Sequence, residues 1–204
     1  VHTETEVLRI DREAREVEVR DLRSGETRRE GYDALVLSPG AEALRPPLPG
    51  IDLPGIFVLR TIPDSRRIRE AVAGASRAVV VGGGFIGLEM VENLVGRGLE
   101  VTVVELADQL MPPLDPEMAS AVATRLRDNG VALLLEQAVE AFEERPGGGL
   151  RVRTSSGEEL EADIAILGIG VRPLSGLAQE AGLELGTRGG IRVDESMRTS
   201  DPDI

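Results

Sequence analysis

The chain has 204 residues, enough for one well-packed core or for one domain with parts of another. Its formal net charge of −13 argues against non-specific nucleic-acid binding, and the absence of cysteine excludes disulfides and thiol catalysis within the chain. No apolar run approaches the length of a membrane span. The first residues are polar and show no signal-peptide pattern, so we expect a cytoplasmic protein without a membrane partner.

The first third of the chain is dominated by strand patterns. Strands are predicted over residues 6–10, 17–20 and 32–40, the last of them buried and running into a turn. Residues 45–50 are too rich in proline for a helix or an inner strand, so they are predicted to form a linker. A helix is predicted over residues 65–73, capped by Asp64 and ended by Gly74.

The central part of the chain carries a glycine motif between a strand and a helix. Apolar residues 77–81 predict a buried strand, and the pattern G-x-G-x-x-G follows at Gly82, Gly84 and Gly87. Gly82 permits a tight turn, Gly84 lets the backbone approach a pyrophosphate, and Gly87 lets the helix pack closely on the strand. The helix N-terminus then presents unpaired N–H groups and a positive dipole end to phosphates. This context predicts dinucleotide binding.

The second half of the chain continues the alternation of strands and helices. A helix is predicted to start at Asp115-Pro116, where an N-cap acid precedes a proline, and to end at Asn129-Gly130. Further strands are predicted over residues 101–104, 131–135, 138–144, 149–154 and 164–167. The last strand runs into Gly168-Ile169-Gly170, and ligands bind at such carboxyl ends in doubly wound sheets.

These elements predict an α/β fold with a Rossmann-like nucleotide-binding domain, a parallel sheet with helices and an antiparallel β crossover. We expect this domain over residues 63–171, with residues 1–62 and 172–204 as parts of a second domain. The flanks contain strand patterns but no helices able to close a core between them. Because the chain opens on Val1 and stops within a pattern at Ile204, we expect it to be part of a longer protein.

Five segments stand out as motifs, namely YDALVLSPGA at residues 32–41, PLPGID at 47–52, LRTIPD at 59–64, GGGFIGLE at 82–89 and GVRP at 170–173. Together they resemble the pyridine nucleotide-disulfide oxidoreductases, which are flavoproteins that use FAD and NAD(P). The segment MPPLDPEMA at residues 111–119 is most similar to the coenzyme A disulfide reductases. Within the family, the resemblance favours the branch that also contains NADH oxidases and persulfide reductases.

The resemblance implies that an NAD(P) domain is inserted into an FAD domain. It implies that Ser38, Pro39 and Gly40 lie at the edge of the FAD site, and that residues 199–204 lead toward a second FAD motif. The first FAD motif and the redox cysteine are expected upstream of Val1, so we expect no catalytic residue in this chain and no activity from the chain alone. We expect a monomer, and a homodimer for the full-length protein, whose dimerisation domain would be C-terminal.

The same resemblance implies a set of NAD contacts. They are Gly82, Gly83, Gly84, Phe85, Ile86, Gly87, Glu89, Glu105, Gly168 and Gly170. Glu105 follows a strand about 20 residues beyond the glycines, where an acid binds the adenosine ribose. A carboxylate there accepts hydrogen bonds from the 2′-hydroxyl and repels a 2′-phosphate, which favours NADH over NADPH. The alternative for Glu105 is a strand-end acid that merely faces water.

The other contacts also have alternatives. The family often places an aromatic residue at the position of Phe85, where it covers the flavin until nicotinamide arrives, but Phe85 could instead be an apolar plug between helix and sheet. Glu89 is either a contact of the nicotinamide half or a surface acid that stabilises the helix dipole. Gly168 and Gly170 contact the nicotinamide half, permit a chain crossover with positive φ, or do both. No spacing of acids suggests a metal site.

Three functions remain open from the sequence. The favoured one is the NAD-binding part of an enzyme that passes a hydride from NADH to FAD and then reduces a small-molecule disulfide or persulfide, coenzyme A disulfide first among them. A second keeps the hydride step and changes the acceptor, as in NADH oxidases or in ferredoxin, rubredoxin and nitrite reductases. A third is a module that senses NADH and catalyses nothing.

Overall fold

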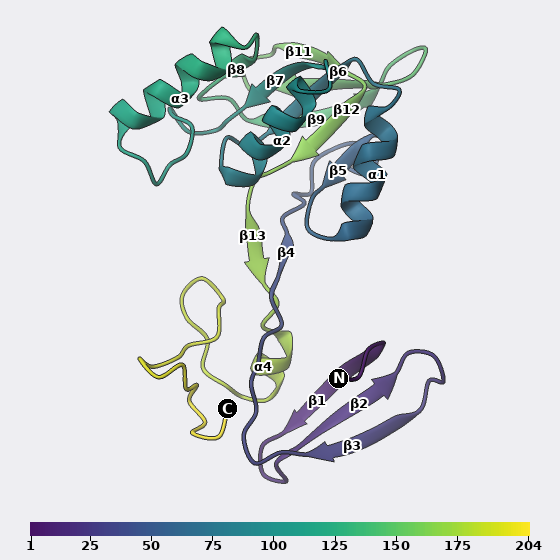
Figure 1. The fold of residues 1–204 in the computed structure, drawn as a ribbon, viewed down its shortest axis with the longest axis vertical. Coiled ribbons are helices and arrows are strands. Elements are labelled where there is room, and N and C mark those ends of the chain that lie inside the picture. The colour runs from purple at the N-terminus through teal and green to yellow at the C-terminus, as the bar shows by residue number, and fades with distance from the viewer. The chain divides into compact units, whose positions relative to one another are not determined.

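A computed structural model describes residues 1–204 (Figure 1). The chain forms two compact units, of which the first combines Val1–Glu42 with Arg172–Ile204 and the second is Ala43–Val171. The chain crosses between the units in β4 (Ala41–Ala43) and again in β13 (Val171–Pro173), and these two short strands pair with each other.

The second unit is built on a five-stranded parallel sheet. Its strand order is β5-β12-β6-β7-β8, in which β12 lies beside β6 although about 80 residues separate them in the chain. The strands are β5 (Ile56–Val58), β6 (Arg77–Val81), β7 (Glu100–Val104), β8 (Ala132–Leu134) and β12 (Ile164–Leu167). The inner strands are almost continuously apolar because both faces of the sheet are covered.

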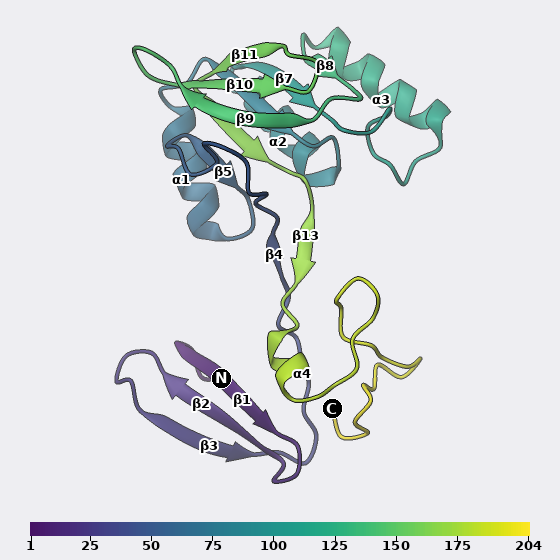
Figure 2. The same ribbon diagram turned by 180° about the vertical axis from the view of Figure 1, so that it is seen from behind.

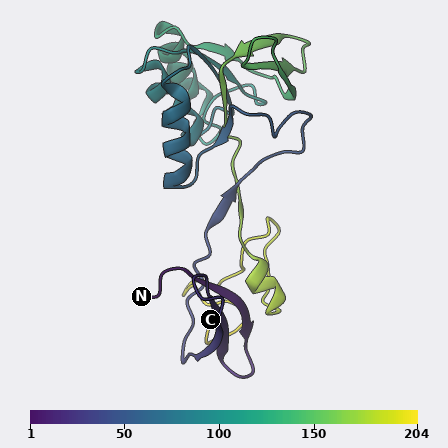
Figure 3. The ribbon, with the colours of Figure 1, turned by 90° about the vertical axis from the view of Figure 1, so that its right-hand side faces the viewer.

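Alternate residues of these strands enter two different cores. Val80, Val103 and Ile166 face the helices α1 (Ile62–Val72), α2 (Phe85–Val95) and α3 (Pro116–Asp128). Val79 and Ala165 face a three-stranded antiparallel sheet of order β11-β10-β9. Its strands are β9 (Val139–Glu144), β10 (Leu150–Thr154) and β11 (Glu159–Ala162). The second unit therefore has three layers, with helices on one side of the parallel sheet and antiparallel strands on the other (Figures 2 and 3). The predicted α/β class with an antiparallel crossover is confirmed.

The first unit is smaller and contains an antiparallel sheet and one short helix. The sheet is formed by β1 (Thr5–Asp11), β2 (Glu16–Asp21) and β3 (Thr27–Gly31), and the helix is α4 (Gly176–Glu180). Four buried residues make its core, namely Ile10, Ala178, Leu183 and Ile204. No helix of the chain is long and apolar enough to cross a membrane.

The strand predicted over residues 32–40 is wrong. A strand requires neighbours for its backbone groups, and the N–H groups of this segment bond in only two places, from Tyr32 to Arg15 and from Leu35 to Asp203. Its apolar pattern reflects packing without a ladder, since Leu35 is half-buried while Val36 is 86% exposed.

The start of the first helix is also corrected. Helix α1 begins at Ile62, three residues before the predicted start, and its N-cap is Thr61 instead of Asp64. Asp64 is the third helical residue, and its carboxylate accepts the Thr61 N–H at 2.8 Å in a capping box. Burial raises the pKa of Asp64, but hydrogen bonds from Thr61, Arg67 and Arg60 outweigh it and hold this pKa below its ordinary value.

Two further differences concern the segments around the linker and the edges of the sheets. Residues 43–62, assigned from the sequence to the first flanking part, lie in the second unit, where β5 pairs with β12. Strands β3 and β11 were not predicted, because the sequences TRREG and ELEA are charged edge strands without a run of apolar residues.

Candidate functional site

The turn between β6 and α2 is closed by backbone packing. Gly82 has φ +102°, and a Cβ there would lie 2.6 Å from the carbonyl oxygen of Gly168. A Cβ at Gly87 would collide with the carbonyl oxygen of Gly82, and one at Gly168 would lie 3.1 Å from the Cα of Gly87. The backbones of β6, α2 and the end of β12 thus meet without intervening side chains. The predicted packing roles of Gly82 and Gly87 are confirmed.

Gly84 lacks a side chain for a different reason. Nothing lies within 4 Å of the position that its Cβ would occupy, and its φ is −83°. Neither the fold nor the backbone conformation excludes a larger residue there. Open space over a glycine is what the approach of a ligand to the backbone requires.

The N-terminus of α2 faces this open space with unpaired donors. Gly84 is the N-cap and supplies no side-chain hydrogen bond, and the first N–H that bonds within the helix is that of Leu88, to the carbonyl of Gly84 at 2.9 Å. The N–H groups of residues 84–87 therefore remain available, at the positive end of the helix dipole. This arrangement suits the phosphate groups of a nucleotide.

Glu105, directly after β7, joins two backbone segments. Its carboxylate accepts the N–H of Gly83 and, at 2.8 Å, the N–H of Ala107. The side chain is half-buried, so the interpretation of an acid that merely faces water is wrong. A carboxylate has about four acceptor positions, so two remain for ribose hydroxyl groups.

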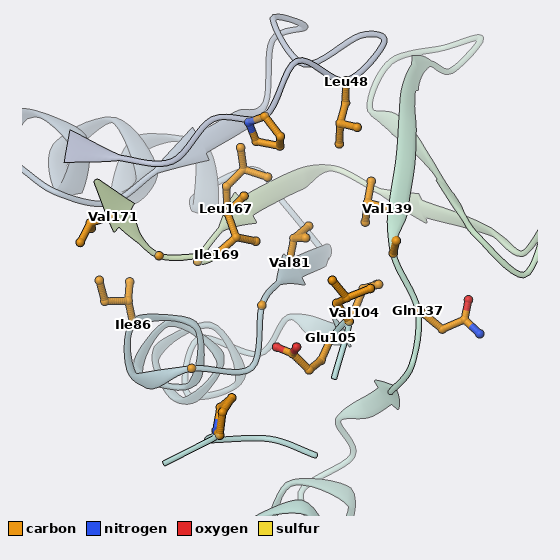
Figure 4. Close-up of a pocket in the computed structure, with 18 of the residues that line it drawn as sticks. Leu48, Val81, Ile86, Val104, Glu105, Gln137, Val139, Leu167, Ile169 and Val171 are labelled. Carbon is orange, nitrogen blue, oxygen red and sulfur yellow. The ribbon is translucent and has the colours of Figure 1, made fainter. Parts of the chain in front are cut away.

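These elements surround a cleft of about 630 Å³ in the second unit. Figure 4 shows Ile86 and Val171 at one end of the cleft, and Glu105 and Gln137 at the other. Gly82, Gly84, Phe85, Ile86, Glu105, Gly168 and Gly170 line it, together with Pro46, Leu48, Leu106, Pro112, Gln137, Val139 and Phe142. A cleft of this size, mostly apolar with a few polar groups, is typical of a small-molecule or cofactor site.

The structure bears on the alternatives considered for Phe85 and Gly170. Phe85 is 64% exposed at the start of α2, so the alternative of an apolar plug between helix and sheet is wrong. Gly170 has φ +107° and its carbonyl accepts the N–H of Leu44 at 3.0 Å, whereas Gly168 needs no positive φ. A crossover conformation and a position in the cleft therefore coexist at Gly170.

Not every predicted residue lies in the cleft. Gly83 and Gly87 are buried and do not line the cleft, and the N–H of Gly83 is already bonded to Glu105. Glu89 is exposed on α2 and borders a crevice of about 560 Å³ between α2 and α3, so its contact with nicotinamide stays a prediction. Ser38, Pro39 and Gly40 are exposed in the first unit, and their place beside FAD also stays a prediction.

Other lining residues were missed by the sequence analysis. Leu106, Pro112 and Gln137 come from irregular segments after β7 and β8, where no periodic pattern marks a site. Of these three residues, only Leu106 could have been inferred from the sequence, because it directly follows Glu105. The chain holds no group of three or more His, Asp or Glu residues that could bind a metal ion.

A glycine turn at the carboxyl ends of a parallel sheet, with an acid after the second strand, defines a dinucleotide-binding protein. A sequence model of the Pyridine nucleotide-disulphide oxidoreductase family matches residues 1–204. The chain belongs to this family, as its resemblance predicted.

Relatives with solved structures share the fold over nearly the whole chain. The reduced Bacillus anthracis CoADR-RHD is 46% identical with a TM-score of 0.92, covering 98% of this chain and 36% of that one. The NAD-dependent persulfide reductase from A. fulgidus is 39% identical with a TM-score of 0.93, covering 100% and 37%. The water-forming NADH oxidase from Lactobacillus brevis, bound to NADH, is 32% identical with a TM-score of 0.91, covering 98% and 44%.

Curated relatives include a different kind of reductase. The nitrite reductase [NAD(P)H] large subunit of Klebsiella oxytoca is 41% identical over 199 residues, 97% of this chain and 20% of that protein. The chain spans less than half the length of this and the other curated relatives that it matches, such as the NADH oxidase of Methanocaldococcus jannaschii at 45%.

Proposed function

We propose that this chain is the NADH-binding part of an FAD-dependent oxidoreductase that passes a hydride from NADH to flavin and on to a disulfide or persulfide such as coenzyme A disulfide. The observation that carries the NADH site is the open space at Gly84, where unpaired N–H groups of α2 and the Glu105 carboxylate share one cleft. Family membership supports the use of FAD and NAD(P)H.

Different residues of the chain bind different parts of NADH. The N–H groups of residues 84–86 bind the pyrophosphate, and Glu105 accepts hydrogen bonds from the adenosine ribose. Apolar Leu106 and Pro112 cover the adenosine side, and Gly168 and Gly170 leave room for the nicotinamide half near Ile86. Bound flavin supplies the hydride acceptor, and the protein's part is to hold the donor in place. No group in this chain is assigned a bond-breaking step.

The acceptor beyond the flavin is proposed from similarity. The relatives CoADR-RHD and the persulfide reductase, with the 111–119 segment, favour a disulfide or persulfide. The NADH oxidases and the nitrite reductase subunit, the latter 41% identical, support the second candidate, in which oxygen or an electron carrier receives the electrons. We further propose a small-molecule substrate, a monomeric state for this chain and a homodimeric one for the whole protein.

The NADH site is tested by Gly84→Ala. We expect NADH to bind about tenfold more weakly, because a methyl group would stand where the pyrophosphate approaches the backbone, while the melting temperature stays unchanged. Gly74→Ala is the matched control, since that glycine also has open space and lies outside the cleft. Isothermal titration with NADH measures both variants. Wild-type affinity in Gly84→Ala would contradict the site.

The preference for NADH is tested at the adenosine end. Glu105→Ala combined with Leu106→Arg removes the carboxylate that repels a 2′-phosphate and adds a cation at an exposed position of the cleft. We expect the ratio of NADH to NADPH affinity to invert. An unchanged ratio would show that the 2′-position lies elsewhere.

The acceptor is tested on the full-length protein with NADH as the donor. Consumption of NADH dependent on coenzyme A disulfide or a persulfide supports the first candidate. Consumption dependent on oxygen or on a rubredoxin supports the second, and binding without turnover supports an NADH sensor.

A further inference from the structure

Gly83 is a glycine that the nucleotide motif does not require. It is the second residue of the G-x-G-x-x-G pattern, and its φ is not positive. A Cβ at Gly83 would nevertheless collide with Cδ2 of Leu110 and lie 3.2 Å from Oε2 of Glu105. A larger residue at this point of the turn therefore requires the buried side chain of Leu110 to shift.

The segment after β7, residues 105–111, holds Gly83 on both sides of the residue. The N–H of Gly83 donates to the Glu105 carboxylate, and the carbonyl of Gly83 accepts the N–H of Met111 at 2.9 Å. Leu110 is 1% exposed and belongs to the core between the sheet and the helices. Residues 105–111 thus satisfy both backbone hydrogen-bonding groups of Gly83 and also occupy the space beside it.

That segment is itself braced. Nε2 of Gln109 donates to the carbonyl of Leu114 at 2.9 Å, and the N–H of Leu114 donates to the carbonyl of Met111 at 2.8 Å. Met111 has φ +49°, a conformation that costs free energy in a residue other than glycine and persists only where the surrounding structure imposes it. The segment therefore supports Gly83 from a fixed position.

The consequence for the cleft follows from the planarity of the peptide bond. The carbonyl of Gly83 and the N–H of Gly84 belong to one peptide unit and point in opposite directions. Because the N–H of Met111 bonds the Gly83 carbonyl, the N–H of Gly84 points to the opposite side of this peptide unit, away from Met111. Gly84 lines the cleft, and Gly83 does not.

We propose that Leu110 is a positioning residue for the pyrophosphate-binding turn, packing under Gly83 so that the Met111 bond fixes the direction of the Gly84 N–H. The inference rests on the proposed NADH site and adds a residue outside the cleft that controls affinity for the pyrophosphate. It predicts that loss of Leu110 weakens ligands that carry a pyrophosphate and spares adenosine.

The experiment compares Leu110→Ala, Leu110→Met and Leu94→Ala in the 204-residue chain. Leu94 has the same 1% exposure and lies in the same core, near the end of α2 remote from the turn, so it reports the cost of a lost core leucine. Affinities for NADH, ADP-ribose and adenosine are measured by ¹⁵N-detected NMR titration, which reaches the millimolar range. Thermal unfolding is recorded for each variant.

We expect Leu110→Ala to bind NADH and ADP-ribose about tenfold more weakly, the effect of one misdirected hydrogen bond to a charged group, and adenosine within twofold of wild type. Leu110→Met restores affinity because it fills a similar volume. Leu94→Ala lowers the melting temperature to a similar extent and leaves all three affinities within twofold.

A second route does not depend on the stability of Leu110→Ala. Gly83→Ala forces Leu110 to move, so we expect it to weaken NADH about tenfold, and Gly83→Ala with Leu110→Val to recover most of the loss because Val lacks Cδ2. NADH affinity within twofold of wild type in Leu110→Ala or Gly83→Ala, or an equal loss for adenosine, would overturn the proposal. A wild-type chain that binds no NADH would instead contradict the proposed function.

Discussion

Each of the two units of the chain is stabilised internally by a different kind of contact. In the second unit, both faces of a parallel sheet are buried, and residues such as Val80, Val103 and Ile166 have no exposed surface. In the first unit, four buried residues make the core, and ion pairs link its distant segments, Arg12 to Asp201 at 2.7 Å and Arg15 to Asp203.

The difference shows where a precise site can be built. Backbone segments can meet at Gly82, Gly87 and Gly168 only because dense apolar packing fixes the strands and helix that carry them. The first unit, with little apolar burial, depends on polar contacts that water and salt weaken. Four sets of substitutions test this difference between the units.

The largest expected effect separates the two cores. Ile166→Ala in the second unit should lower the free energy of unfolding by about 4 kcal/mol, and Ile10→Ala in the first by about 2 kcal/mol, because half-buried neighbours around Ile10 can relax into the space. Hydrogen exchange followed by peptide mass spectrometry assigns each loss to its unit. Equal losses would remove the distinction between the cores.

Glycines with positive φ give the second test. Gly82→Ala should cost about 3 kcal/mol, since an unfavourable φ adds to a contact with the Gly168 carbonyl. Gly25 in the first unit also has a positive φ, +76°, but nothing lies within 4 Å of the position of its Cβ. Gly25→Ala should therefore lower the free energy of unfolding by only about 1 kcal/mol. Urea denaturation compares them, and a small cost at Gly82 would show that β12 can move aside.

We expect Asp163 to make the stability of the second unit depend on pH. Hydrogen bonds from the backbone N–H groups of Ser76 and Arg77 lower the pKa of Asp163 below its ordinary value. The unfolded chain therefore takes up a proton first as pH falls, so this stabilisation is complete above about pH 4 and is lost as pH falls toward the folded pKa.

Asp163→Asn should cost about 1–2 kcal/mol at neutral pH and progressively less near pH 3, as measured by urea denaturation at each pH. A cost that does not change with pH would mean that the charge of Asp163 contributes nothing.

The smallest effect is expected at the ion pairs of the first unit. Arg12 bonds Asp201 and also the carbonyls of Ala181 and Gly182, so Arg12→Ala should cost about 1 kcal/mol, less in high salt, and only in the first unit. Arg23→Ala removes an exposed pair with Glu4 and should cost close to nothing. Salt titration during denaturation measures both, and a cost of Arg12→Ala that salt leaves unchanged would argue for packing instead of charge.

Most of the second unit could be predicted from the sequence. The glycine turn, the strands β6, β7 and β12, and the start of α3 at Asp115-Pro116 follow local rules of periodicity and capping. The errors lie where local pattern and pairing disagree. Residues 32–40 have a strand-like composition but no neighbouring strand to pair with. The charged strand β3, in contrast, forms because it pairs with the free edge of β2.

The candidate site divides in the same way. The glycine turn and the acid at Glu105 could be located from the sequence alone, because the conformational needs of glycine and the end of a strand are encoded within a few residues. The tertiary fold was needed to show that Gly84 is open while Gly83 is covered, that Glu89 lies outside the cleft, and that Leu110 packs against Gly83. These features depend on contacts between segments that are distant in the sequence, and local sequence patterns do not encode such contacts.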